Sequence, residues 1–208
     1  MRTFLLAAGA AIAALGLADC NRSGGQNPPS AATAEEKAAT PSAHPGATVL
    51  SADDETKAPT FTAKAAASDQ FEIQASKLAL QRSSNPEVKR FARMMIDAHT
   101  KTTAQLKQAA DDAGVAIPTP VVLPSDMQGK LNDLEKVSLA DFDKTYLDDV
   151  VDAHQSALNV MQRYAQDGDQ AQIKSLAAEV APKVQQHLTM AKSIKDDLAK
   201  GAGGTAQG

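Results

Sequence analysis

Apolar residues recur at three- and four-residue intervals through most of the chain beyond residue 60, and this spacing constrains the fold more than any other feature. Such a period gives an α-helix one apolar face, whereas a β-strand needs a period of two. Asn-Pro and Gly signals typical of helix ends bound several of these segments. The pattern predicts four long helices, at residues 60–83, 86–113, 141–167 and 169–198.

The second and third of these helices are joined by a long connector, residues 114–140. Its first part contains VAIPTPVVLP, whose prolines forbid a regular helix. Ser125 and Gln128 then have the spacing of a capping box and predict a short helix, with Leu131 and Leu134 resting on the main bundle. Four long helices with one long crossover predict an all-α fold, a ferritin-like four-helix bundle at residues 60–199.

The first twenty residues have the pattern of an export signal. The apolar run from Phe4 to Leu17 is shorter than the roughly 20 residues that span a bilayer, so residues 1–19 are interpreted as a signal peptide. Cys20 follows directly and resembles the lipidated cysteine of a bacterial lipoprotein, although Asp19 stands where a small residue is expected. Cleavage after Ala18 is the alternative. A lipid on Cys20 would anchor the protein to a membrane without spanning it.

Residues 20–59 and 200–208 are rich in Ala, Ser, Thr, Gly and Pro and have almost no apolar side chains to bury. They are predicted to be a disordered tether, which includes His44, and a disordered tail. We therefore expect an exported protein in the periplasm, anchored to the outer membrane if Cys20 is lipidated. The net charge of −4 gives no basic surface, so nucleic acid is excluded as a partner.

Three histidines lie on the apolar faces of different predicted helices: His99, His154 and His187. Glu72 lies on the inward face of the remaining long helix. Each of the four lies within about three residues of the middle of its helix, an offset of roughly 4 to 5 Å. Mid-helix positions meet in a bundle whichever way each helix runs, so the four side chains are predicted to form one buried layer.

This layer has two interpretations. A carboxylate and neutral imidazoles are natural ligands for Zn, Fe, Mn or Cu, which makes Glu72, His99, His154 and His187 a candidate metal site. Alternatively, an ion pair between Glu72 and a histidine, together with water, satisfies the layer without a metal. The Glu-x-x-His motif of di-iron bundles is absent, because the residues three positions before the histidines are Ile96, Val151 and Val184.

Other chemistry has less support in the sequence. Met95, Met161 and Met190 lie near the histidine faces and have thioethers that bind copper, but methionine at helical spacing more often fills gaps in a core. The single cysteine excludes a multi-cysteine zinc site, and no phosphate loop, nucleophile elbow or catalytic carboxylate pair is present. The first hypothesis is therefore a non-enzymatic envelope protein acting in binding or stress tolerance. The alternative is a metal-binding or metal-dependent redox protein.

Three stretches of the chain resemble a bacterial exported family: FEIQASKLALQRSSNPEVKRFARMMIDAHT, FDKTYLDDVVDAHQSAL and APKVQQHLTMAKSI. That family is known as "predicted outer membrane protein" or as a domain of unknown function and is placed with the ferritin-like bundles. The resemblance covers about residues 61 to 197 and includes these positions: Glu72, Asp97, His99, Asp143, Tyr146, His154 and His187. It implies the bundle fold and export but no reaction.

Overall fold

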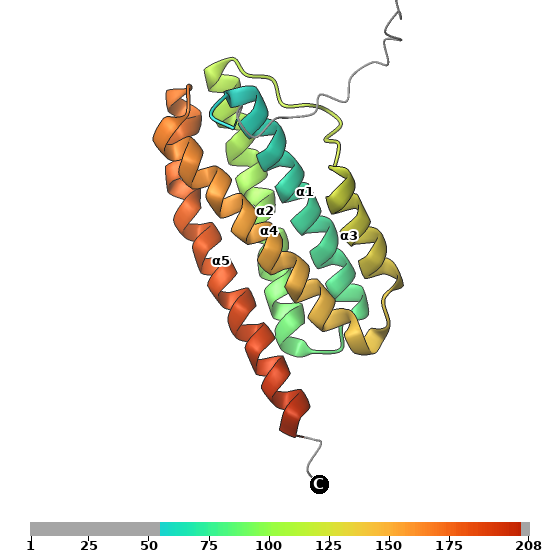
Figure 1. Ribbon diagram of the computed structural model, residues 1–208. Helices are drawn as coiled ribbons and strands as arrows, with labels where there is room; N and C mark the ends of the chain where they lie inside the picture. Colours follow the sequence, from blue (N-terminus) through green and yellow to red (C-terminus); the bar gives the residue numbers. More distant parts are fainter. Residues whose placement is uncertain (1–54, 205–208) are drawn as a thin grey trace, which may run out of the picture. The chain divides into compact units, whose positions relative to one another are not determined.

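The computed structural model describes residues 55–204, with side chains to residue 200. It contains four long helices and one short helix: α1 (Ala58–Arg82), α2 (Pro86–Ala113), α3 (Ser125–Lys136), α4 (Leu139–Asp167) and α5 (Ala171–Gly204). Helices α1 and α2 pack together, as do α4 and α5, and contacts of α1 with α4 and of α2 with α5 close the bundle (Figure 1). The prediction of an all-α bundle with a short helix in its long connector is confirmed.

Several predictions fall on the unplaced ends of the chain. The signal peptide at residues 1–19, Cys20, most of the tether at 20–59 and residues 205–208 lie outside the described residues. Helix α1 begins two residues inside the predicted tether, and α5 runs to Gly204, past the predicted end at 199. None of the helices in the described part of the chain is long and apolar enough to cross a membrane.

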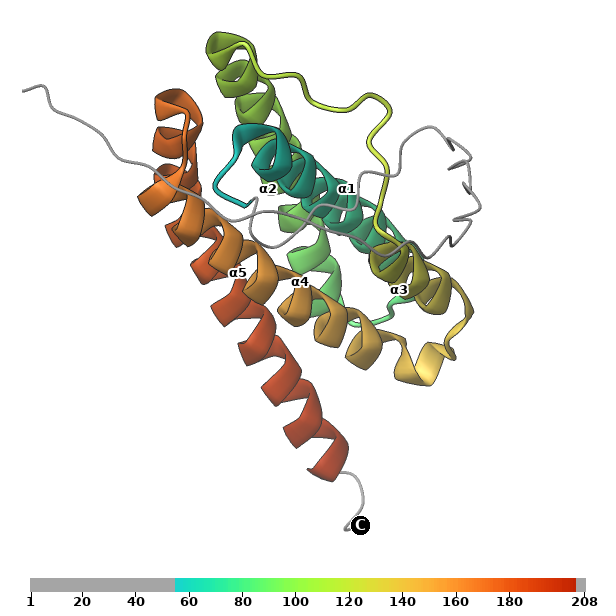
Figure 2. The same cartoon turned by 45° about the horizontal axis from the view of Figure 1, so that its top comes forward.

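The connector between α2 and α4 leaves the top of α2 and descends along the outside of the bundle to α3, as the turned view shows (Figure 2). Helix α3 packs on α1 and α4 through the buried Leu131 and Leu134, as the sequence predicts. Arg82, at the end of α1, donates hydrogen bonds to the backbone carbonyls of Leu134 and, at 2.6 Å, Val137. The guanidinium group therefore ties the junction of α3 and α4 to α1.

Helix α2 has the ends that its sequence predicts. The side chain of Asn85 accepts hydrogen bonds from the backbone N–H groups of Glu87 and Val88, at 2.8 and 3.3 Å, and Pro86 occupies the first turn. Gly114 ends the helix with φ of +67°, a left-handed conformation that glycine adopts without strain. These local signals set the length of α2 and so the height of its histidine.

The capping box predicted at Ser125 is wrong. Helix α3 does begin at Ser125, but its first turn has no side-chain cap. Asp169 accepts hydrogen bonds from the backbone N–H of Ala58 at 2.9 Å and from the hydroxyl of Tyr164 at 3.1 Å, and α5 begins at Ala171. The carboxylate of Asp169 therefore connects the start of α1 with the end of α4.

The bundle has separate apolar clusters on either side of a polar middle. One cluster lies where α1 ends and α2 and α4 begin, and its largest members are Phe71, Phe91, Leu134, Phe142 and Tyr146. Another lies at the opposite end and is built around Phe61, Leu106, Tyr164 and Ile173. A smaller cluster follows the contact of α4 and α5. Between the two larger clusters, each long helix contributes polar side chains to the interior.

Candidate metal centre

Three imidazole rings from three helices meet in this polar middle layer. His99 comes from α2, His154 from α4 and His187 from α5, and their ring centroids are 5.4, 5.6 and 5.9 Å apart. One ring nitrogen of each histidine lies within 4.8 Å of the corresponding nitrogens of the other two. The structure therefore brings together the three histidines that the sequence analysis selected.

Helix α1 provides the negative charge of the layer, through Asp69 and Glu72. Both side chains are buried, at 7% and 1% exposure, and they lie three residues apart on the face that meets α2 and α4. The neighbouring buried positions on α1 are largely alanines, which let the other helices approach closely: Ala65, Ala66, Ala67, Ala75 and Ala79. Short side chains around the two acids thus place their carboxylates against the imidazoles.

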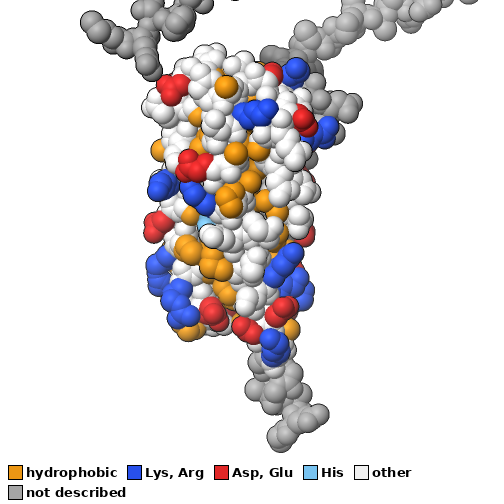
Figure 3. Space-filling model, turned by 90° about the vertical axis from the view of Figure 1, so that its left-hand side faces the viewer, with side chains coloured by type: hydrophobic (Ala, Val, Ile, Leu, Met, Phe, Trp, Pro, Cys, Tyr) orange, Lys and Arg blue, Asp and Glu red, His pale blue; other side chains and the backbone are white. Residues whose placement is uncertain are grey.

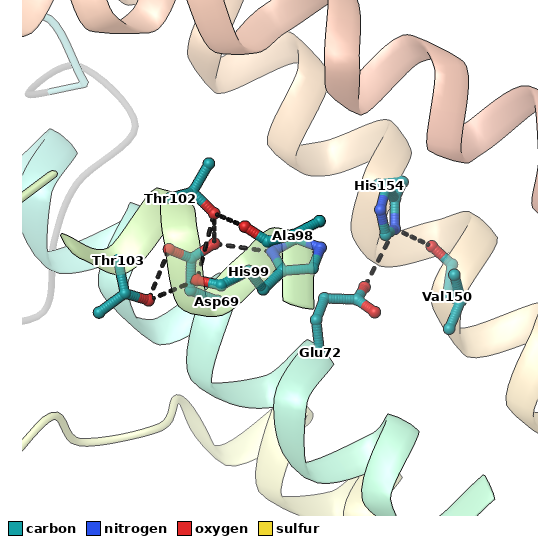
Figure 4. Close-up of polar contacts among 8 residues, drawn as sticks. All are labelled: Asp69, Glu72, Ala98, His99, Thr102, Thr103, Val150 and His154. Carbon is teal, nitrogen blue, oxygen red and sulfur yellow. Dashed lines mark hydrogen bonds and ion pairs between the residues drawn. The ribbon is translucent and has the colours of Figure 1, made fainter. Parts of the chain in front are cut away.

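Asp69 holds His99 in a defined orientation (Figure 4). The Nδ1 atom of His99 donates to Oδ1 of Asp69 at 2.7 Å, and the hydroxyl of Thr103 lies 2.9 Å from Oδ2 of the same carboxylate. The hydroxyl of Thr102 lies 3.3 Å from Oδ1. Because the proton of a neutral His99 is then on Nδ1, its Nε2 atom keeps a free lone pair, as in carboxylate–histidine–metal arrangements.

His154 is oriented by a backbone carbonyl and by Glu72. Its Nδ1 donates to the carbonyl oxygen of Val150 at 3.0 Å and lies 3.1 Å from Oε1 of Glu72 (Figure 4). Burial disfavours the charged form of His154, but the Glu72 carboxylate outweighs it, with smaller contributions from Val150 and Asp69. Together they raise the pKa of His154 above 6.5. The environment of this ring therefore favours a positive charge.

His187 differs from the other two histidines because it is only partly buried and, among the described residues, has no carboxylate beside it. Burial, and to a lesser extent the neighbouring His154 and His99, lower the pKa of His187 to about 4. At neutral pH this imidazole is uncharged, which is the form that binds a metal.

Each imidazole has one buried nitrogen without a hydrogen-bond partner among the described residues: Nε2 of His99, Nε2 of His154 and Nδ1 of His187. Both carboxylate oxygens of Glu72 are buried and similarly lack a hydrogen bond within that part of the chain. An unsatisfied buried polar group costs about 1–3 kcal/mol, so several in one layer indicate a site for a ligand.

The polar layer continues past Glu72 along α1. Ser76, one turn further on, forms a hydrogen bond of 2.9 Å with the hydroxyl of Tyr146, and both side chains are fully buried. Burial, together with the charge of Glu72, raises the pKa of Tyr146 despite the opposing hydrogen bond from Ser76. Tyr146 is therefore a neutral phenol that closes the layer against the apolar cluster.

The sequence analysis proposed four ligands, and the structure gives them two different positions. One ring nitrogen from each histidine converges with those of the other two. Glu72 instead lies against Nδ1 of His154, outside this group of nitrogens. Asp69, the partner of His99, was missed. Its only sequence signal is its position three residues before Glu72, which places it on the same side of the helix.

Comparisons with known proteins give a family and a fold. The family model DUF4142, described as a domain of unknown function, matches residues 30–194. The structure is similar to CopM in the Cu(II)-bound form, with 16% identity, a TM-score of 0.59, and coverage of 68% of this chain and 97% of CopM. For CopM in the Ag-bound form the values are 17%, 0.55, 68% and 96%. A comparison with curated proteins gives no match. At these identities the likeness to CopM is one of fold.

Proposed function

Since the chain belongs to the DUF4142 family, a domain of unknown function, its role has to come from its site, and we propose that it binds a copper ion through His99, His154 and His187. The observation that carries this proposal is the convergence of three ring nitrogens from three helices in the interior of the bundle. It favours the metal-binding alternative over a scaffold with no ligand.

The distances fit a metal after a small contraction. Three atoms that are at most 4.8 Å apart all lie within about 2.8 Å of a common point, whereas metal–imidazole bonds are about 2.0–2.1 Å long. An inward movement of roughly 0.7 Å by each ring would complete the coordination, which is within the reach of side-chain adjustment. The free nitrogens of the three rings are the ones available for this purpose.

The surrounding charges also fit a cation. Two buried carboxylates, Asp69 and Glu72, lie beside the two most buried imidazoles. A metal ion would balance this negative charge. Carboxylates that accept the second N–H of a ligating histidine fix the ring and increase its basicity. Asp69 would act in this way on His99, whereas Glu72, 3.1 Å from Nδ1 of His154, would act on that ring through its charge.

Copper is preferred among the candidate metals for two reasons. Imidazole sites bind Cu²⁺ more tightly than the other divalent first-row ions. In addition, CopM, which has the same fold, is described in Cu(II)-bound and Ag-bound forms. Zn, Fe and Mn, the other ions considered from the sequence, have no comparable support. We further propose that the protein handles copper in the periplasm, held at the outer membrane if Cys20 carries a lipid.

The direct test is the copper content of protein purified without chelators, together with copper titration of the metal-free chain. We expect one tightly bound Cu²⁺ ion at the triad, and loss of this ion in the His99→Ala, His154→Ala and His187→Ala variants. His187 is the least buried of the three, so H187A is the variant that disturbs the fold least.

The fourth histidine of the chain provides a matched control. His44 lies in the predicted tether, and H44A should bind copper as the natural chain does. Circular dichroism would show that the variants remain helical. Equal copper binding by H187A, H154A and H44A would contradict the proposal, because the triad would then not be the site.

A further inference from the structure

A second feature lies beside the histidine triad, where α2 and α5 face each other. A groove of about 280 Å³ runs between these helices and is lined by Glu87, Arg90, Phe91, Met94, Met190, Ser193 and Ile194. Met94 and Met190 are both partly buried and come from opposite walls of the groove. Two thioethers therefore share one surface depression, and nothing in the proposed function uses them.

The position of this groove follows from the register of the two helices. His99 of α2 and His187 of α5 lie against each other, with ring centroids 5.9 Å apart. Met190 follows His187 by three residues and Met94 precedes His99 by five, which are axial distances of roughly 4.5 and 7.5 Å. Because α2 and α5 run in opposite directions, both methionines lie on the same side of the histidine layer (Figure 1).

The histidine layer is not fully enclosed by the bundle. Histidine reaches the surface on the face that carries α5, and hydrophobic side chains lie directly below it (Figure 3). His187 is the only partly exposed member of the triad. The groove is thus next to the edge at which the histidine site meets solvent.

The chemistry of the two side chains defines the ion that they would bind. Thioether sulfur is a soft, uncharged ligand that selects Cu(I) over hard divalent ions. The charged residues of the groove, Glu87 and Arg90, are 4.0 Å apart and compensate each other, so the groove has no excess charge to attract Mg²⁺ or Ca²⁺. Phe91 and Ile194 provide an apolar floor that partly excludes water.

We propose that Met94 and Met190 form a second metal site, specific for Cu(I), at the solvent-facing edge of the histidine triad. The site binds the ion through the two Sδ atoms and involves no change of oxidation state. It stands on the groove and its thioethers, and it does not require the triad to bind copper.

The experiment is a titration of the full chain, labelled with ¹³C at the methionine methyl groups, with Ag(I) as a redox-inert probe for Cu(I). The methyl signals of Met94 and Met190 should shift together and saturate at one equivalent, while those of Met95 and Met161 stay in place. The M94L/M190L variant should lose one equivalent of Ag(I), because leucine preserves the volume but removes the sulfur.

Two controls make the result decisive. Met161 is a partly buried methionine that packs away from the groove, so M161L should bind Ag(I) as the natural chain does. The triple variant H99A/H154A/H187A should keep the paired methionine shifts, which separates this site from the triad. Unshifted Met94 and Met190 signals, or equal shifts of Met95 and Met161, would overturn the proposal even if the triad binds copper.

Discussion

The polar middle layer and the apolar clusters that flank it lie in the same bundle but contribute differently to its stability. In the cluster near the start of α2, large side chains such as Phe71 and Phe142 are fully buried among other apolar residues. In the middle layer, Asp69, Glu72 and the histidines are buried too, yet several of their polar atoms have no partner within residues 55–200. The clusters stabilise the fold, whereas the layer is unfavourable without a ligand.

The largest effect should come from a change in the apolar part. Phe71→Ala removes a fully buried ring and should lower the free energy of unfolding by about 3–5 kcal/mol. The copper content of the folded variant should stay the same, because the triad is intact. Urea denaturation and metal analysis measure the two quantities. Leu139→Ala, at a side chain that is 69% exposed, is the control and should change stability by less than about 0.5 kcal/mol. A loss of copper in folded F71A would break the distinction between the two regions.

A change in the polar layer should have the opposite sign. Replacing Glu72 and His154 together by leucine removes a buried ion pair and its unsatisfied atoms. Such replacements are often stabilising by about 1–4 kcal/mol. We therefore expect the metal-free double variant to resist urea better than the natural chain and to bind no copper at the triad. A double variant less stable than the natural metal-free chain would show that the pair contributes net stability.

A smaller effect should come from the residue that orients His99. Asp69→Asn keeps the shape of the side chain but removes its charge and its preference for the proton on Nδ1. Loss of such a partner typically weakens metal binding 10–100-fold. A competition titration with a copper chelator measures this change, and D152N, at an exposed carboxylate on α4, is the control. Equal affinities of D69N and D152N would exclude a positioning role for Asp69.

Two opposing effects should appear in the pH dependence of stability of the metal-free chain. The pKa of His187 falls from 6.5 in the unfolded chain to about 4 in the fold, so the unfolded chain binds more protons between these values. Stability is therefore lost as the pH falls from 6.5 towards 4. The raised pKa of His154 acts in the opposite direction, since its contribution is present below pH 6.5 and disappears as the pH rises through the raised value.

The H187A variant isolates the first of these two contributions. Urea midpoints measured between pH 4 and pH 8 in the presence of a chelator should fall less on the acid side for H187A than for the natural chain. H44A should follow the natural chain. Parallel curves for H187A and the natural chain would mean that the proton on His187 is not excluded by the fold.

The sequence alone predicts much of the difference between the polar layer and the apolar clusters. The height of His99 follows from a helix whose ends are marked by the local residues Asn85 and Gly114. The histidines lie on apolar faces, so their burial and convergence follow from helical periodicity and the geometry of a bundle. The same reasoning could not find Asp69, because its partner His99 is thirty residues away on another helix.

The all-α class, the order of the helices and the convergence of three imidazoles follow from the amino-acid sequence, because they depend on periodicity and on end signals within each helix. The side-chain partners come from the packing of the helices: Asp69 for His99, Glu72 for His154, and Ala58 for the carboxylate of Asp169. This packing also places Met94 and Met190 in one groove. The reason is physical, since the rotation and register of packed helices arise from contacts between residues far apart in the chain.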